Sequence, residues 1–135
     1  MQFYSTNRKT SPVSLREAVV RGLAADRGLF MPEVIRRFPP AFYQNMKEMT
    51  LREISFVVAE AFFGEDVEAG KLKEIVDETL NFDIPLVQVA DNRYSLELFH
   101  GPTLAFKDVG ARFMARLLAY FNKQEGERQV NVLVA

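Results

Sequence analysis

An apolar stripe at helical spacing runs through residues 106–121 and limits what this part of the chain can fold into. Its members recur every three or four positions: Phe106, Val109, Gly110, Phe113, Met114, Leu117, Leu118 and Phe121. Since an α-helix turns once in about 3.6 residues, this spacing places them on one broad face. The sequence therefore predicts a helix that buries this face. Asp108, Arg112 and Arg116 fall opposite, with Asp108 and Arg112 spaced for an i,i+4 ion pair.

Lys107 borders the stripe, in the first turns of the predicted helix. A Gly-Pro turn precedes the helix, and the positive end of the helix dipole disfavours an ammonium there. Phe99, Leu104 and Phe106 are expected to exclude water around the amine, which also favours its neutral form. Neutral lysine attacks aldehydes, which is the chemistry that holds pyridoxal phosphate. The alternative, favoured by periodicity alone, is a snorkelling lysine whose ammonium reaches water.

Residues 96–116 read LELFHGPTLAFKDVGARFMAR, and this string resembles the pyridoxal-phosphate attachment segment of the threonine synthase family. In that family the lysine of the Ala-Phe-Lys-Asp run holds the cofactor as a Schiff base, and here that lysine is Lys107. The beginning of the chain resembles the family independently. The matching runs are Tyr4-Ser5-Thr6, Val13-Ser14, Glu17-Ala18, Gly22-Leu23-Ala24 and Gly28-Leu29-Phe30-Met31-Pro32.

Two positions depart from the family pattern. Asp26-Arg27-Gly28 stands where a second glycine is common, and Leu15 stands where an aromatic residue is frequent. Neither position touches the lysine site.

The resemblance implies a lyase of the tryptophan synthase β-like fold that depends on pyridoxal 5'-phosphate. Its reaction would convert O-phospho-L-homoserine and water to L-threonine and phosphate, the last step of threonine biosynthesis. Lys107 would be the catalytic and cofactor-binding residue, Phe106 would pack against the cofactor ring, and His100 and Thr103 would bind substrate. The residues alone leave alternatives open: Phe106 in the core, His100 bonded to turn backbone, and Thr103 as N-cap of the helix.

Composition excludes several other classes of site. The chain has no cysteine and a single histidine, His100, which excludes disulfides, thiolate catalysis and zinc or triad sites built from several histidines. Seventeen basic residues are scattered among eighteen acidic ones, so we expect no nucleic-acid partner. No apolar stretch approaches the roughly 18 residues of a membrane span, and the start is not a signal peptide. We therefore expect a cytoplasmic protein with no metal and no membrane partner.

The rest of the chain predicts an α/β fold with a helix-rich beginning. Two helices should start at capping boxes, in which a hydroxyl and a glutamate three residues later satisfy free backbone N–H groups. The predicted helices are Leu15–Ala24 after Ser14, Leu51–Phe63 after Thr50, and Glu68–Leu80 with Leu72, Ile75, Val76 and Thr79 on one face. Pro39-Pro40 makes a break, and residues 34–49 carry no clear pattern.

After Pro85 the apolar period changes to that of strands. Residues 86–89 and 94–99 predict a β-hairpin joined through Asp91-Asn92. The Lys107 helix follows, and residues 130–134 have the near-continuous apolar character of a buried parallel strand. We therefore predict an amino-terminal domain over residues 1–93 and the first βαβ unit of a catalytic domain, incomplete, over residues 94–135.

The family resemblance also implies a Gly- and Ser/Thr-rich loop for the cofactor phosphate, and these residues do not include one. We therefore expect an amino-terminal fragment that is inactive alone and that self-associates through surface exposed by truncation. The alternatives are a non-catalytic α/β interaction module and a related pyridoxal-phosphate eliminase.

Overall fold

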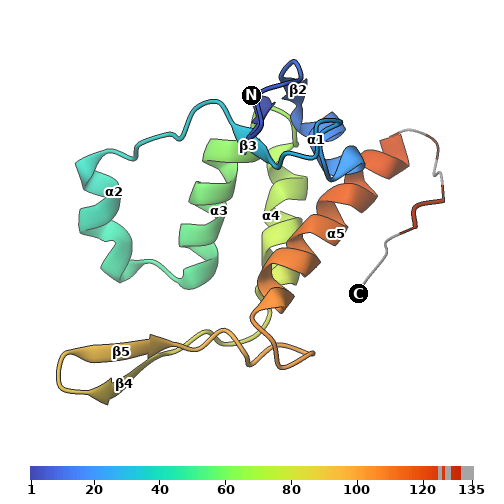
Figure 1. Cartoon of the computed structure of the whole chain (residues 1–135). Helices are drawn as coiled ribbons and strands as arrows, with labels where there is room; N and C mark the ends of the chain where they lie inside the picture. The colour runs from blue at the N-terminus through green and yellow to red at the C-terminus, as the bar shows by residue number, and fades with distance from the viewer. Residues whose placement is uncertain (125, 127–128, 132–135) are drawn as a thin grey trace.

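The computed structural model describes residues 1–124, 126 and 129–131. A small sheet and four of the helices build one core, and a β-hairpin extends from the end of these helices opposite the sheet (Figure 1). The sheet is antiparallel, with β1 (Gln2–Ser5) between β2 (Val13–Ser14) and β3 (Phe30–Pro32). Sequence periodicity did not predict this sheet. Its strands have only four, two and three residues, too few for an alternating pattern to appear.

The predicted helices are present, with small changes at their ends. Helix α3 (Leu51–Phe63) has the predicted bounds, and α4 (Ala69–Thr79) uses Glu68 and Leu80 as its two caps. Helix α1 (Leu15–Arg21) ends three residues earlier than predicted, because Gly22 adopts a φ of 70° that no helix continues. In the region without a clear pattern, α2 (Pro40–Asn45) and the 3₁₀ turn η1 (Met46–Glu48) follow Pro39.

Only one of the two expected capping boxes is reciprocal. At α3 the Thr50 hydroxyl accepts from the Glu53 N–H, while the Glu53 carboxylate accepts from the Thr50 backbone N–H and hydroxyl. These last two bonds hold the pKa of Glu53 below its ordinary value. At α1 the Ser14 hydroxyl accepts from the Glu17 N–H as predicted. The Glu17 carboxylate instead pairs with Arg21 at 2.7 Å.

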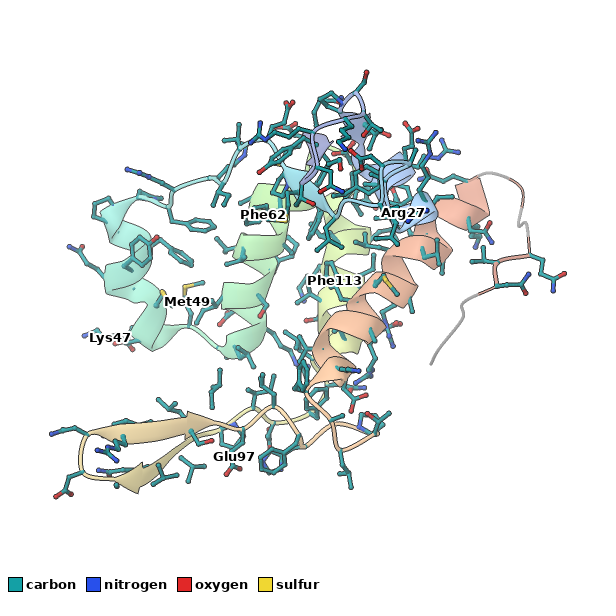
Figure 2. All side chains as sticks on the ribbon, in the orientation of Figure 1. Arg27, Lys47, Met49, Phe62, Glu97 and Phe113 are labelled. Carbon is teal, nitrogen blue, oxygen red and sulfur yellow. The ribbon has the colours of Figure 1, made fainter. Side chains whose placement is uncertain are left out.

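The core lies where α1, α3, α4 and the long helix α5 (Lys107–Gln124) meet. The predicted face of α4 is buried in full, and it contributes Leu72, Ile75, Val76 and Thr79. Leu117 and Phe121 of α5 reach the same core. Phe113 of α5 packs on Phe63 of α3, with ring centroids 5.3 Å apart, and Figure 2 shows Phe113 on the α4 side of α5. No helix among the described residues is long and apolar enough to cross a membrane.

The predicted hairpin consists of β4 (Leu86–Ala90) and β5 (Arg93–Leu96), which pair antiparallel. Asn92 has a φ of 54°, as the tight connection requires. The second strand is shorter than predicted, because residues 97–99 leave the ladder. Val130 and Asn131 are described without strand structure, and the remainder of the predicted strand at 130–134 lies outside the described residues.

Asp26 ties the loop before β3 to the end of β1. Its carboxylate accepts from the Ser5 hydroxyl at 2.6 Å, from the Gly28 N–H at 3.0 Å and from the Lys9 N–H at 2.9 Å. The Ser5 hydroxyl, followed by these backbone groups, holds the pKa of Asp26 below its ordinary value. Gly28 is required here, since a Cβ would stand 2.0 Å from the Ser5 hydroxyl. Arg27, which lies between Asp26 and Gly28, has a φ of 66°.

Arg27 is one of the departures from the family pattern, and its backbone explains why glycine suits the position. A non-glycine residue in the left-handed region costs about 1–2 kcal/mol, while glycine costs about 0.5–1 kcal/mol through unfolded-state entropy. We predict that Arg27→Gly raises the free energy of unfolding by roughly 0.5–1 kcal/mol. Urea denaturation of Arg27→Gly and Arg27→Ala checks this. A gain in both variants would assign the effect to the lost side chain and contradict the backbone explanation.

Loss of the Thr50 cap should destabilise the chain. We predict that Thr50→Ala lowers the free energy of unfolding by about 1 kcal/mol, because the N–H of Glu53 loses its acceptor at the start of α3. Thr50→Ser keeps the hydroxyl and serves as the control. Equal urea midpoints for Thr50→Ala and Thr50→Ser would show that the cap contributes nothing.

Candidate functional site

Lys107 is the first residue of α5, as the sequence predicted for the first turns of this helix. This end of α5 adjoins the segment that leads from the hairpin, and the other end reaches the α1 side of the molecule (Figure 1). The side chain is exposed, and it has no hydrogen bond or ion pair to any described residue. In contrast, Lys71 and Lys73 pair with Glu74 and Asp77. The Lys107 amine therefore has no bonding partner among the described residues, and it lies at the positive end of an 18-residue helix.

The expected apolar shield around Lys107 is absent from the described residues. Phe99, Leu104 and Phe106 remain 49%, 76% and 64% exposed. The prediction that they exclude water from the amine is therefore wrong for this structure. Phe106 comes immediately before the first helical residue and is not buried with the stripe, which excludes the alternative core role for it here.

A tight turn over residues 101–106 delivers the chain into α5. The Leu104 N–H donates to the Gly101 carbonyl at 3.0 Å, and the Asp108 N–H donates to the Ala105 carbonyl at 3.0 Å. Leu104 has a φ of 57°, an unfavourable conformation for a leucine. The turn therefore keeps Leu104 in a backbone conformation that needs support from its surroundings.

Asp108 provides support from beneath this turn. Its side chain is buried, at 4% exposure, and its Oδ2 accepts from the Thr103 N–H at 2.9 Å. Two predictions are therefore wrong. Asp108 does not pair with Arg112, which instead donates to the Glu78 carbonyl and to Asn81. Thr103 is not the N-cap of α5, because the helix begins at Lys107, four positions later.

His100 pairs with Glu97 just before the turn. The His100 Nε2 and the Glu97 Oε2 are 2.7 Å apart, and the imidazole stacks on Phe99 with centroids 4.7 Å apart. The alternative in which His100 satisfies turn backbone groups has no hydrogen bond in its favour among the described residues. The side chain of Glu97 is 22% exposed, and its own N–H donates to the Pro85 carbonyl. The histidine is therefore held by a carboxylate next to the segment that carries Lys107.

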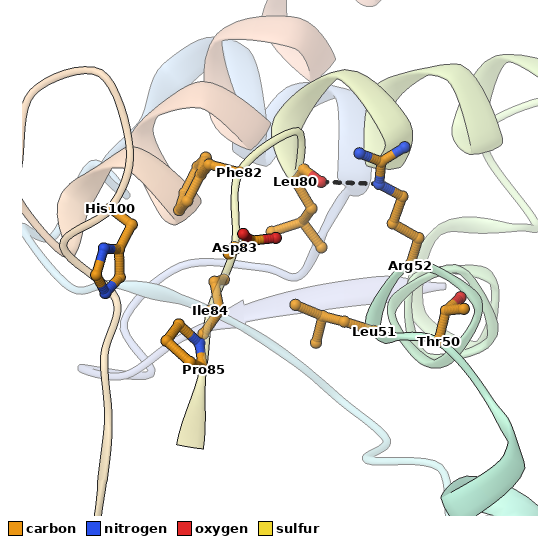
Figure 3. Close-up of a pocket in the computed structure, with 9 residues that line it drawn as sticks. All are labelled: Thr50, Leu51, Arg52, Leu80, Phe82, Asp83, Ile84, Pro85 and His100. Carbon is orange, nitrogen blue, oxygen red and sulfur yellow. Dashed lines mark hydrogen bonds between the residues drawn. The ribbon is translucent and has the colours of Figure 1, made fainter. Parts of the chain in front are cut away.

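A cleft of 680 Å³ opens beside His100 (Figure 3). Its other walls are the start of α3 and the connection from α4 to β4, and Arg52 Nε donates to the Leu80 carbonyl at its edge. His100 and Asp83 contribute polar groups to it. Within the described part of the chain, His100 is the one predicted site residue that lines this cleft. Lys107, Phe106 and Thr103 lie together in the adjoining turn and helix start.

Sequence reasoning missed two residues that shape this region. From the sequence, Asp108 appeared to be a solvated residue on the polar face of a helix. Apolar periodicity identifies the helix face that packs on the core, and it gives no information about contacts made by the other face. The signal for its burial was the Gly-Pro turn five to seven residues earlier, which brings backbone N–H groups over the first helical turn. Glu97 was assigned to a strand, and the end of the strand at Leu96 frees it to meet His100.

The residues present fit an aldehyde cofactor in one respect that this structure itself provides. An exposed amine without a carboxylate partner can become neutral and react, whereas a paired lysine must first lose its partner. The neighbouring carboxylate, Asp108, accepts a hydrogen bond from the Thr103 N–H in the turn and forms no ion pair with the amine.

Comparison with known families and proteins gives one consistent result. The family model described as "Threonine synthase N terminus" matches residues 2–80. The threonine synthase of Serratia marcescens is 38% identical over 135 residues, which is 100% of this chain and 31% of that protein. That of Saccharomyces cerevisiae is 34% identical, over 99% of this chain and 30% of its own length.

Solved structures are similar over most of the chain. The threonine synthase of Brucella melitensis, with pyridoxal phosphate bound, superposes with a TM-score of 0.89 at 34% identity, covering 95% of this chain and 29% of its own. The Escherichia coli threonine synthase gives a TM-score of 0.83 at 36% identity, covering 90% and 28%. The chain thus spans about a third of the length of the curated relatives it matches.

Proposed function

Because this chain belongs to the threonine synthase family, we propose that it is the amino-terminal part of a pyridoxal-phosphate lyase acting on O-phospho-L-homoserine. The products are L-threonine and phosphate. The observation that carries the proposal is the position of Lys107. It is the first residue of α5, it lies within the segment that resembles the family's cofactor-attachment sequence, and its amine has no partner among the described residues. When bound, pyridoxal phosphate supplies an electron sink for carbanion chemistry next to the substrate nitrogen.

Lys107 has two tasks in this proposal. Its Nζ holds the cofactor covalently, and after the substrate amine replaces it, the freed Nζ takes the proton from the substrate α carbon and returns protons later. Because Lys107 has no ion pair with a described residue, none of the described carboxylates must be displaced before the amine reacts, which suits both tasks.

The neighbouring residues bind and orient in this proposal. Phe106, exposed and adjacent to Lys107, supplies an apolar surface for the cofactor ring. His100, held at 2.7 Å by Glu97, presents an imidazole to the anionic substrate, and the Thr103 side chain lies on the same turn. The Glu97 contact fixes the orientation of the imidazole at the edge of the cleft. No metal takes part.

The wider assignments follow from the same proposal. The partner is a small-molecule substrate, with neither nucleic acid nor membrane involved, and the location is cytoplasmic. Residues 1–93 form the family-specific domain and 94–135 begin the catalytic one. Exposed apolar residues on the hairpin and the turn, among them Leu86, Val89 and Leu104, favour self-association of the chain when it stands alone.

Removal of the Lys107 amine tests the proposal in the full-length enzyme. Lys107→Ala should lose the absorbance of covalently held cofactor and reduce phosphate release by at least about 100-fold, since both covalent binding and proton transfer are lost. Lys123→Ala, near the far end of α5, is the matched control. Covalent cofactor and turnover at wild-type levels in Lys107→Ala would refute the role of this lysine.

The 135-residue chain by itself should not hold the cofactor. Lys107, Leu104 and Phe106 are open to solvent, so water reaches any bond formed at the amine and hydrolyses it. Gel filtration after addition of pyridoxal phosphate should yield protein without the cofactor absorbance and without phosphate release from phosphohomoserine. A stoichiometric covalent complex that turns over substrate would mean that the site is complete within these residues.

A further inference from the structure

Asp108 has the one deeply buried carboxylate among the described residues. The other buried polar side chains in the described part of the chain, Ser5 and Thr79, are hydroxyls, while Asp108 is 4% exposed. No lysine or arginine in the described part of the chain pairs with it. Its Oδ2 accepts a hydrogen bond from the backbone N–H of Thr103 at 2.9 Å. Burial of a carboxylate is costly without a cation, so the contact with the turn must be structurally important.

The turn is closely fitted to this carboxylate. Gly101 lies against it, and a Cβ at that position would stand 2.5 Å from Oδ2 and 2.9 Å from the carboxyl carbon. Asp108 therefore holds the turn at Gly101 by close packing and at Thr103 by a hydrogen bond. Leu104 follows with its unfavourable φ of 57°. Without the two contacts, the turn would relax toward ordinary backbone conformations and α5 would begin differently.

We propose that Asp108 is a positioning residue for Lys107: its buried carboxylate fixes the 101–106 turn so that α5 begins at Lys107 with the amine directed at the cofactor. This inference rests on the proposed function, since it assumes that Lys107 holds the cofactor. Asp108 itself faces the turn and contacts no reacting atom. It acts through the backbone on either side of Lys107, which lies between the fixed turn and the packed part of α5.

Two substitutions separate geometry from charge at position 108. In the full-length apoenzyme, Asp108→Ala removes the acceptor for the Thr103 N–H, whereas Asp108→Asn keeps an oxygen that accepts the same bond. We expect Asp108→Ala to slow covalent attachment of added pyridoxal phosphate by about 10- to 100-fold, the range that misplacement of a reactive group produces. Asp108→Asn should stay within about threefold of wild type, because the hydrogen bond survives.

Amide exchange and a second variant keep the test independent of overall stability. Exchange at Thr103 should accelerate in Asp108→Ala and stay slow in Asp108→Asn and in the control Asp91→Ala at the hairpin tip. Gly101→Ala pushes on the same carboxylate from the other side and should slow attachment similarly. If Asp108→Ala does not fold, Gly101→Ala carries the test. In an Asp108→Ala background, Gly101→Ala should have a smaller effect, because the closest contact, with Oδ2 at 2.5 Å, is gone.

The attachment rates of these variants decide whether the positioning role holds. Wild-type attachment rates in Asp108→Ala or in Gly101→Ala would overturn the inference, and so would an Asp108→Asn variant as slow as Asp108→Ala, which would make the charge decisive. Lys107→Ala, measured in parallel, distinguishes the two levels of the proposal. If it attaches the cofactor normally, the proposed function fails. If it does not, while Asp108→Ala attaches normally, only the positioning role fails.

Discussion

The packing of α5 on α1 and α4 is the interaction on which the rest of this structure depends. Leu117 and Phe121 are 3% and 2% exposed, and each contributes about 1.5–3 kcal/mol through burial. This contact joins the last long helix to a core formed by the beginning of the chain. It fixes the axis of α5, and the position of Lys107 at the head of the helix follows from that axis.

Burial along α5 is graded, and the gradient separates stability from chemistry. Phe121 and Leu117 are buried in the second half, Phe113 is partly buried in the middle, and Phe106, immediately before the first residue, is exposed. The end that carries the amine thus contributes little to the core and is available for ligands. At that end Asp108 and the turn replace core packing as the source of order, with one hydrogen bond and one close glycine contact.

Patterns that repeat along a helix were predictable, and contacts that depend on how the chain turns were not. The buried face of α4 and the core positions Leu117 and Phe121 followed from periodicity, because helix packing repeats with the helical turn. The place of Lys107 in the first turns of α5 followed from the Gly-Pro turn, although the helix begins later than a cap at Thr103 would have put it. The burial of Asp108 did not, because periodicity carries no information about a turn that folds back over the helix start. The three-stranded sheet was not predicted, because its strands are too short to show an alternating apolar pattern.

The most direct test of the central claim, that Lys107 is the residue that holds the cofactor, is chemical trapping in the full-length enzyme. Borohydride fixes pyridoxal phosphate on the nitrogen to which it is bound, and mass spectrometry of the digested protein then locates the added mass. We expect the label on Lys107, in the peptide that contains residues 101–108. A label on Lys71, Lys73 or Lys123, with Lys107 unmodified, would contradict it.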